Sequence, residues 1–320
     1  MKKSISVVIP NYNGSNLLRE NLPYVFLALK SSGIDDYEII VADDASTDDS
    51  IPFLQNNYPE IIVVQNKTNQ GFSGNTNSGI YKATKDLILI LNSDVQLQEN
   101  YFIPLLKYFD DDKTFGVMGR IISMSGDKIQ DGAKFPSYSF AKIISTKNYL
   151  VEKRNSLYSF FLSGADALIE RKKLLQLGGF NELFNPYYGE DVDLGISAWR
   201  AGYKLYYEHN AICRHPNSAT IQKESSKKVK LISKRNKLIL HYLHLENFEL
   251  FIFFLITIFK IILKLFLLDF TYLKAFFTFF KMRREIKERK INYSKIWKLN
   301  LHRVKSFIID NIKNDVVIKF

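Results

Sequence analysis

Polar residues end three of the apolar runs in the first hundred residues, and two of these polar stretches carry carboxylates. In chain order the stretches are Pro10-Asn11-Tyr12-Asn13-Gly14, Asp43-Asp44 and Asn92-Ser93-Asp94. Oxygen ligands of this kind bind hard divalent cations, which are often held together with phosphates. Each stretch also has a structural interpretation, because Asn, Ser and Asp favour turns and helix caps.

A second acidic cluster contains Glu190, Asp191 and Asp193 and follows the run Tyr187-Tyr188-Gly189. These acids open a segment whose apolar spacing favours a helix. Acidic side chains in the first turn are stabilised by the helix dipole, which accounts for one or two of them. Three acids together exceed what a cap requires, and this favours a functional role.

The elements around these stretches predict an α/β fold. Short β-branched runs at 4–9, 37–42, 61–64 and 87–91 are typical of strands. Segments of helical length lie between them at 17–31, 48–57 and 73–83. Near-continuous apolar strands separated by helices predict a parallel sheet covered on both faces, with ligands beyond the carboxyl ends of its strands. The three polar stretches should therefore meet at one edge.

The composition and charge of the chain restrict what kind of protein it can be. The 320 residues are 46% hydrophobic and 24% charged, as in ordinary folded proteins, and allow about two domains. The single cysteine, Cys213, allows no intramolecular disulfide and is consistent with a reducing compartment. The net charge of +11 comes mainly from residues beyond His215, which predicts a polyanionic partner. The basic clusters flank a long apolar segment, which favours an anionic membrane surface over a nucleic acid as this partner. We expect a cytoplasmic catalytic part.

Seven stretches, in this order, resemble family 2 glycosyltransferases of the GT-A fold, close to the rhamnosyltransferase-like branch. The resemblance covers roughly residues 4 to 220. It rests on "VVIPNYNG", "VADDASTDDS", "NQGFSGNTNSGI", "LILNSDV", "SGADALIERKKLLQLGGFNELF", "GEDVDLGISAWRAGY" and His215. It implies a GT-A nucleotide-sugar transferase fold, with a Rossmann-like, mostly parallel mixed sheet between helices. It also implies inverting transfer of a sugar from a nucleoside-diphosphate-sugar to an acceptor hydroxyl.

The resemblance also implies roles for particular residues. Asp94 and His215 match the family's ligands for a divalent cation, Mg²⁺ or Mn²⁺, which offsets the charge of the diphosphate leaving group. Asn92 stands in place of the first Asp of the family's Asp-x-Asp motif. Asp191 matches the general base that takes the acceptor's proton. Glu190 and Asp193 would orient the acceptor or the helix.

Donor recognition is implied by resemblance in the same way. Pro10 and Tyr12 would lie along the base and ribose, and Asp44 would bond the base edge. The remaining residues expected near the nucleotide are Asp43, Gly74, Asn75, Asn77 and Ser93. We expect a UDP- or dTDP-linked sugar and a glycan or lipid-linked acceptor of bacterial O-antigen, capsule or cell-wall synthesis.

The segment 248–280 is rich in Phe, Leu and Ile, but Lys260, Lys264, Asp269 and Lys274 interrupt it, so no uninterrupted transmembrane run remains. Helical phase gathers its lysines into one stripe, with a break between two helices near Asp269. This pattern predicts amphipathic helices lying on an inner-leaflet membrane surface. A helical pair packed on protein and a transmembrane hairpin are the alternatives.

We therefore expect a catalytic domain at 1–225, with a nucleotide-binding half at 1–95 and an acceptor half at 96–225. A basic, membrane-associating region follows at 226–320. The enzyme would be peripheral, on the cytoplasmic face of the plasma membrane, with homo-oligomers allowed and no nucleic-acid partner. A nucleotide-sugar-binding protein without transfer activity is the alternative function, because Asn92 removes one carboxylate from the motif.

Overall fold

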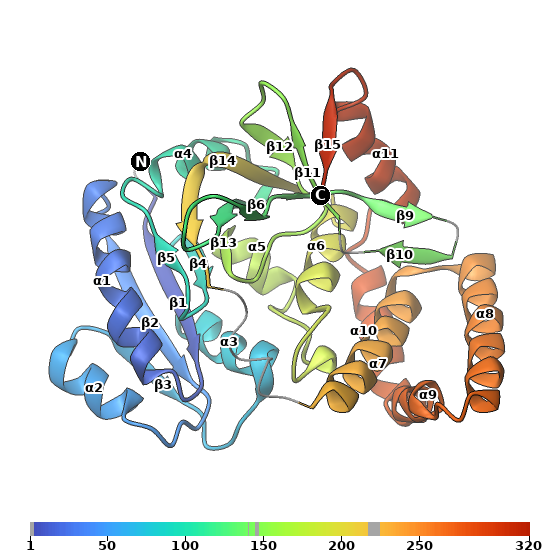
Figure 1. The fold of residues 1–320 in the computed structure, drawn as a ribbon. Coiled ribbons are helices and arrows are strands. Elements are labelled where there is room, and N and C mark those ends of the chain that lie inside the picture. The colour runs from blue at the N-terminus through green and yellow to red at the C-terminus, as the bar shows by residue number, and fades with distance from the viewer. Residues whose placement is uncertain (1–2, 140, 145–146, 217–224) are drawn as a thin grey trace.

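The computed structural model describes residues 3–139, 141–144, 147–216 and 225–320. One large mixed sheet forms its centre, with the strand order β12-β14-β6-β13-β4-β1-β2-β3. Helices cover both of its faces, and the C-terminal helices gather on the side of the molecule opposite α1 and α2 (Figure 1). A mixed α/β sheet between helices is what the sequence predicted.

The N-terminal half of the sheet is parallel throughout, with β1 between β2 and β4 and β3 beyond β2. Its apolar runs alternate between two cores, because successive strand residues face opposite ways. Ile5, Val7 and Ile9 pack under α1, whereas Val8 faces the core that includes Ile80 of α3. The elements are β1 (Ile5–Asn11), α1 (Ser15–Ser31), β2 (Tyr37–Asp43), α2 (Ser50–Asn57), β3 (Ile62–Gln65), α3 (Gly71–Lys82) and β4 (Leu87–Leu91).

The second half of the sheet is mixed. Strand β13 runs antiparallel to both β4 and β6, and β14 runs parallel to β6. The long β14 carries the chain from the middle of the molecule back to the edge where β4 ends, because its Cys213 pairs with Leu97 of β5. The elements are β5 (Gln96–Leu97), α4 (Ile103–Leu106), η1 (Lys107–Asp110), β6 (Thr114–Ile122), β7 (Ile129–Asp131), β12 (Ser156–Tyr158), β13 (Asp166–Glu170), α5 (Arg171–Gln176), η2 (Glu182–Phe184), α6 (Glu190–Arg200) and β14 (Lys204–Arg214).

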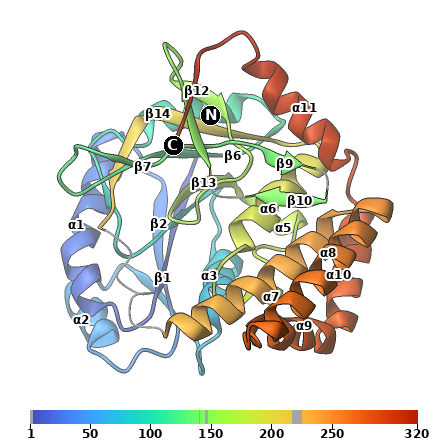
Figure 2. The same ribbon diagram turned by 45° about the vertical axis from the view of Figure 1, so that its right-hand side comes forward.

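The helices from α7 to α11 pack against the first 225 residues rather than standing apart from them. Leu243 of α7, Tyr293 of α10 and Val304 of α11 are buried in the same core as Val8 of β1 and Trp199 of α6. Figure 2 shows these helices side by side along one flank. Their bounds are α7 (Ser226–His244), α8 (Asn247–Phe266), α9 (Thr271–Lys281), α10 (Arg283–Ser294) and α11 (Leu301–Asn311). Within the described residues, no helix is sufficiently long and apolar to cross a membrane.

The polar segment between β7 and β12 forms short strands. A small sheet joins it to the C-terminus, with the order β15-β11-β8, and β9 pairs with β10. The C-terminal strand was not expected from the sequence, which read as basic and helical there. The remaining bounds are β8 (Ala133–Lys134), β9 (Ser137–Ser139), β10 (Lys142–Ile144), β11 (Asn148–Val151) and β15 (Val317–Lys319).

Candidate active site

The first two polar stretches meet where β1 and β2 end. The side chain of Asn11 donates to Asp43 Oδ1 at 2.9 Å, and the amide of Asp44 donates to the carbonyl of Asn11 at 2.9 Å. Asp43 also accepts from the amide of Ser46 at 3.0 Å. Asp43 thus fixes the loops after both strands, as its turn interpretation predicted.

Asp44 is buried and holds the loop that leads into α3. Its Oδ1 accepts from the amide of Gln70 at 2.7 Å and from Asn66 at 3.1 Å, and its Oδ2 accepts from the amide of Gly71 at 3.0 Å. A carboxylate has about four lone-pair sites, so one remains for a ligand. Contact with a base edge stays a prediction, and loop positioning is the role seen in the structure.

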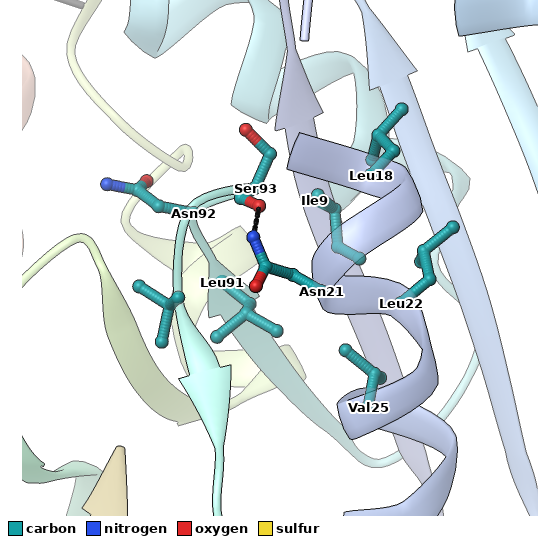
Figure 3. A pocket seen from close by; sticks show the side chains of 9 residues that line it. Ile9, Leu18, Asn21, Leu22, Val25, Leu91, Asn92 and Ser93 are labelled. Atoms are coloured by element: carbon teal, nitrogen blue, oxygen red, sulfur yellow. Dashed lines mark hydrogen bonds between the residues drawn. The ribbon is translucent and has the colours of Figure 1, made fainter. Parts of the chain in front are cut away.

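The third stretch brings Asp94 to His215. The two lie in different halves of the chain, and Asp94 Oδ1 is 3.2 Å from His215 Nε2. Asn21 of α1 stabilises the turn after β4, because its side chain donates to the carbonyl of Ser93 at 2.8 Å (Figure 3). In the same view the side chain of Asn92 points away from α1. The sheet topology therefore joins the two expected cation ligands, because β14 returns His215 to the end of β4.

The spacing of this pair fits one divalent cation. Adjacent ligands of an octahedral ion at about 2.1 Å lie about 3 Å apart, close to the separation seen here. Burial disfavours the charged form of His215, but the hydrogen bond to Asp94 and its charge outweigh this and raise the pKa of His215. The described residues contain no cluster of three or more His, Cys, Asp or Glu that could hold a metal. A cation here would need further ligands from a phosphate or from water.

The acidic cluster lies in the first turn of α6, as its spacing predicted. Gly189 precedes it with φ 101°, and a side chain there would collide with the ring of Phe184. Glu190 is buried, and its Oε2 has no hydrogen-bond partner among the described residues. Asp191 is half-buried and accepts from the amide of Val192 at 2.8 Å. Burial raises the pKa of both carboxyls, and the charge of Asp191 adds to the effect on Glu190. Asp191 is therefore the member of the pair that solvent reaches and that can accept a proton.

Asp193 faces the opposite way and is fully buried. Tyr293 donates to its Oδ2 at 2.6 Å, His244 Nε2 lies 2.8 Å from its Oδ1, and Asn181 donates at 3.1 Å. Burial lowers the pKa of His244 despite the nearby carboxylate. Of the two roles expected for Asp193, orienting the helix is the one that this geometry supports, since His244 of α7 and Tyr293 of α10 occupy its two carboxylate oxygens.

Sequence reasoning missed two charged residues that act electrostatically on Asp191. Lys134 is buried, bonds to Asp131 and donates to Asn148 at 3.1 Å. Its charge lowers the pKa of Asp191, though by less than burial raises it. The charge of Asp131 raises the pKa of both Asp191 and His215, so it lies within electrostatic range of both. Asp131 therefore acts electrostatically on both the cation pair and the acidic helix.

The other expected donor residues divide into two groups. Tyr12 is 51% exposed beside the end of β1, where a base could stack on it, and Pro10 and Ser93 lie at the same edge. Asn75 and Asn77 are instead buried within α3. Asn75 donates to the carbonyl of Ala42 at 2.9 Å, and Asn77 bonds to the backbone of Phe180. These bonds favour a structural role for both amides over the donor contact that we expected.

Gly74 also lies in α3, where a side chain would approach the Cβ of Gln70 to 2.8 Å. The loop between η2 and α6 is held by a residue that sequence reasoning missed. Asn236 of α7 donates to the carbonyls of Phe184, Tyr187 and Tyr188 at 2.7, 2.9 and 2.8 Å. A lone Asn in a basic helix carries no recognisable motif, so only the fold reveals its contact with the segment before the acids.

The chain is similar in sequence to known bacterial glycosyltransferases. The chain is 27% identical over 225 residues to the O-antigen chain rhamnosyltransferase RfbN of Salmonella typhimurium, covering 69% of this chain and 68% of the relative. It is 25% identical over 213 residues to the GalNAc(5)-diNAcBac-PP-undecaprenol beta-1,3-glucosyltransferase of Campylobacter jejuni, covering 65% and 62%.

Two solved structures share the fold at low sequence identity. GalNAc-T7, solved with UDP, GalNAc and Mn²⁺, has a TM-score of 0.60 at 17% identity, over 76% of this chain and 48% of that one. The mannosyltransferase PcManGT of Pyrobaculum calidifontis, solved with GDP-Man and Mn²⁺, has a TM-score of 0.53 at 17% identity, over 76% and 64%. The model of glycosyl transferase family 2 matches residues 6–177, which is more than half of the chain. The chain therefore belongs to glycosyl transferase family 2.

Proposed function

We propose that this chain is an inverting glycosyltransferase that moves a sugar from a nucleoside-diphosphate-sugar to an acceptor hydroxyl. The observation that carries the proposal is the contact of Asp94 with His215 at the sheet edge, together with the half-buried acid Asp191 in the first turn of α6. Membership of glycosyl transferase family 2 supports it. A diphosphate held at the first group would place its sugar toward the second.

The proposed reaction is a single displacement. The acceptor oxygen forms a bond to the anomeric carbon while the bond from that carbon to the diphosphate breaks, and the diphosphate leaves with the electron pair. Asp191 takes the acceptor's proton. It suits this role because it is half-buried and its pKa is raised by burial, which makes its carboxylate a better base. Attack from the side opposite the leaving group inverts the anomeric centre.

Asp94 and His215 would hold a divalent cation, Mg²⁺ or Mn²⁺, in the proposed enzyme. When bound, such an ion offsets the negative charge that grows on the departing diphosphate. Asn92 contributes an amide where the usual motif has a carboxylate, so the protein brings one negative charge fewer to the ion. We therefore expect the ion to depend more on the donor's phosphates for its binding than it would with two acids.

The donor is proposed to be a UDP- or dTDP-linked sugar, stacked by its base on Tyr12 near Pro10. GalNAc-T7 was solved with UDP and PcManGT with GDP-Man, which supports a nucleoside-diphosphate sugar as the class. The proposed acceptor is a glycan or lipid-linked glycan in bacterial surface polysaccharide synthesis. The names of the Salmonella and Campylobacter relatives support this class, since one is an O-antigen enzyme and the other acts on an undecaprenol-linked glycan. Such an acceptor would place the enzyme on the cytoplasmic face of the plasma membrane, as a peripheral protein.

The test is release of nucleoside diphosphate by the full chain, with a panel of nucleotide sugars, Mg²⁺ or Mn²⁺ and lipid-linked acceptors. We expect acceptor-dependent release with one donor. Asp191→Asn should abolish turnover and leave donor affinity, measured by calorimetry, nearly unchanged. Asp112→Asn, at an exposed acid, is the matched control. Full turnover by Asp191→Asn would remove the base assignment, and donor binding without any release would favour the non-transferring alternative.

A further inference from the structure

Large apolar side chains are concentrated on the surface of one segment. Among the described residues, 14 of the 27 large hydrophobic residues that are exposed lie between Phe248 and Phe280. The most exposed are Phe266 at 82%, Leu268 at 78% and Phe259 at 66%. Soluble proteins rarely expose a contiguous apolar patch of this kind unless a partner covers it.

Helix α8 is apolar on two opposite faces. The residues that face the protein are Leu250, Phe253, Phe254, Thr257 and Ile261. At 100° per residue these fall within an arc of about 100°. The exposed apolar residues occupy the opposite arc of about 160°, and they are Phe248, Phe251, Leu255, Ile256, Ile258, Phe259, Ile262, Leu263 and Phe266. The outer face is therefore not the side that attaches α8 to the protein.

Helix α9 repeats this design. Ala275 and Phe279 are buried against the protein, whereas Phe277 and Phe280 are exposed on the other side. The exposed Lys274 lies at the border of the apolar face in helical phase, as Lys260 does on α8. The predicted break between the two helices is present, since α8 ends at Phe266 and α9 begins at Thr271. The outer faces of α8 and α9, together with Leu267, Leu268 and Phe270 between them, form what we call the apolar platform.

Positive charge predominates around the platform. Asp269 is the one acid between residues 250 and 281, against four lysines. It lies 3.7 Å from Lys234 and 4.0 Å from Lys264, so its charge is compensated. Beyond the platform, exposed Lys281, Arg283 and Arg284 extend the cationic border into α10. An apolar surface with a cationic border matches the interface of an anionic bilayer, where acyl chains take the aromatic residues and headgroups take the lysines.

We propose that the apolar platform of α8 and α9 inserts into the interfacial layer of an anionic membrane, with the helices lying along it. The inner face of α8 stays packed on α7 and α9, since Phe253 stacks on His241 and Phe254 contacts Phe279, so binding needs no unfolding. This surface needs neither donor nor acceptor, and its test is separate from the proposed sugar transfer.

The experiment is flotation of the full chain with vesicles of phosphatidylglycerol and phosphatidylcholine, against vesicles of phosphatidylcholine alone. We expect binding to the anionic vesicles that weakens with salt. The double variant F259E/F266E should lose at least tenfold in partitioning, since it places carboxylates on the outer face. K274E/K281E should lose the preference for anionic over neutral vesicles. I103E, at a 54% exposed isoleucine of α4, is the matched control and should bind normally.

Circular dichroism of each variant checks that the fold is kept. Undiminished vesicle binding by folded F259E/F266E would overturn the proposal. So would a wild-type chain that ignores vesicles but forms a dimer, by light scattering, that F259E/F266E dissociates. That result would assign the platform to a second copy of the chain. If Asp191→Asn loses sugar transfer but still binds vesicles, membrane binding by the apolar platform is independent of the proposed sugar transfer.

Discussion

The hydroxyl of Tyr293 gives the sharpest test of how the C-terminal helices support the acidic turn. Tyr293 is 3% exposed, and its hydroxyl donates to Asp193 Oδ2 at 2.6 Å, two residues from the proposed base. Tyr293→Phe removes one oxygen and leaves the ring in place. Asp193 keeps His244 and Asn181 as partners, at 2.8 and 3.1 Å, so its carboxylate stays partly satisfied.

The loss is that of one hydrogen bond to a charged acceptor, which is worth about 1.5–3 kcal/mol. We therefore expect the free energy of unfolding to fall by about 2 kcal/mol, or roughly a 30-fold change in the unfolding equilibrium. Urea titration followed by tryptophan fluorescence is a direct assay. The two tryptophans are well placed, because Trp199 lies in α6 and Trp297 packs 5.5 Å from both Tyr293 and His244, between ring centroids.

The matched control is Tyr81→Phe. Tyr81 is 59% exposed, and its hydroxyl makes one long bond of 3.3 Å to the carbonyl of Gly178. We expect its loss to cost less than about 0.5 kcal/mol, as for most surface changes. If Tyr293→Phe destabilises the protein no more than this control, the buried network does not hold α6 to the C-terminal helices, and the structural role given to Asp193 is wrong.

Three further predictions concern the titrating groups and the cation. Burial raises the pKa of Asp191, and the base must be ionised to accept a proton. Activity should therefore be lost as pH falls through a midpoint above the ordinary value for Asp of about 4. Lys134→Met removes a charge that lowers the pKa of Asp191, so the midpoint in a pH–rate profile of this variant should move to higher pH. Chelation by EDTA should stop release of nucleoside diphosphate, and Asp94→Asn should raise the Mn²⁺ concentration for half-maximal activity at least about tenfold; undisturbed turnover in EDTA would contradict the cation site. Burial, with the charge of Asp131, raises the pKa of Asp166 to about 7, so the folded protein holds a proton that the unfolded chain releases and stability should decline as pH rises from about 4 to about 7. Asp166→Asn should remove that slope and be more stable at pH 8 by on the order of 1–4 kcal/mol, as measured by urea titration; an unchanged slope would refute the protonated state.

Local pattern was sufficient for the first half of the sheet. The runs that became β1, β2, β3 and β4 are short and β-branched, and the parallel order follows from the helices between them. Their polar ends met as expected, since parallel strands finish at the same edge. The acidic turn of α6 and the helix break before Thr271 also followed from spacing alone.

Local pattern failed where a side chain's role depends on what reaches it from elsewhere. Asn77 lies in a polar, glycine-bearing stretch that resembles a nucleotide-binding loop, yet its side-chain amide is hydrogen-bonded to the backbone of Phe180. The C-terminal strand β15 pairs with β11, a distant partner that no local pattern indicates. No local pattern singles out Lys134, which lies in β8, is buried and pairs with Asp131.

The sequence by itself determined which residues could do chemistry and on which kinds of element they lie, because residue type, apolar period and turn chemistry act over a few neighbours. Only the tertiary structure decided which of those residues share a site. His215 lies next to Asp94 because β14 runs beside β6. Asp193 points into the core instead, because its carboxylate is hydrogen-bonded there to Tyr293 and His244. Pairing between distant segments depends on which surfaces pack together, and that is a property of the whole fold.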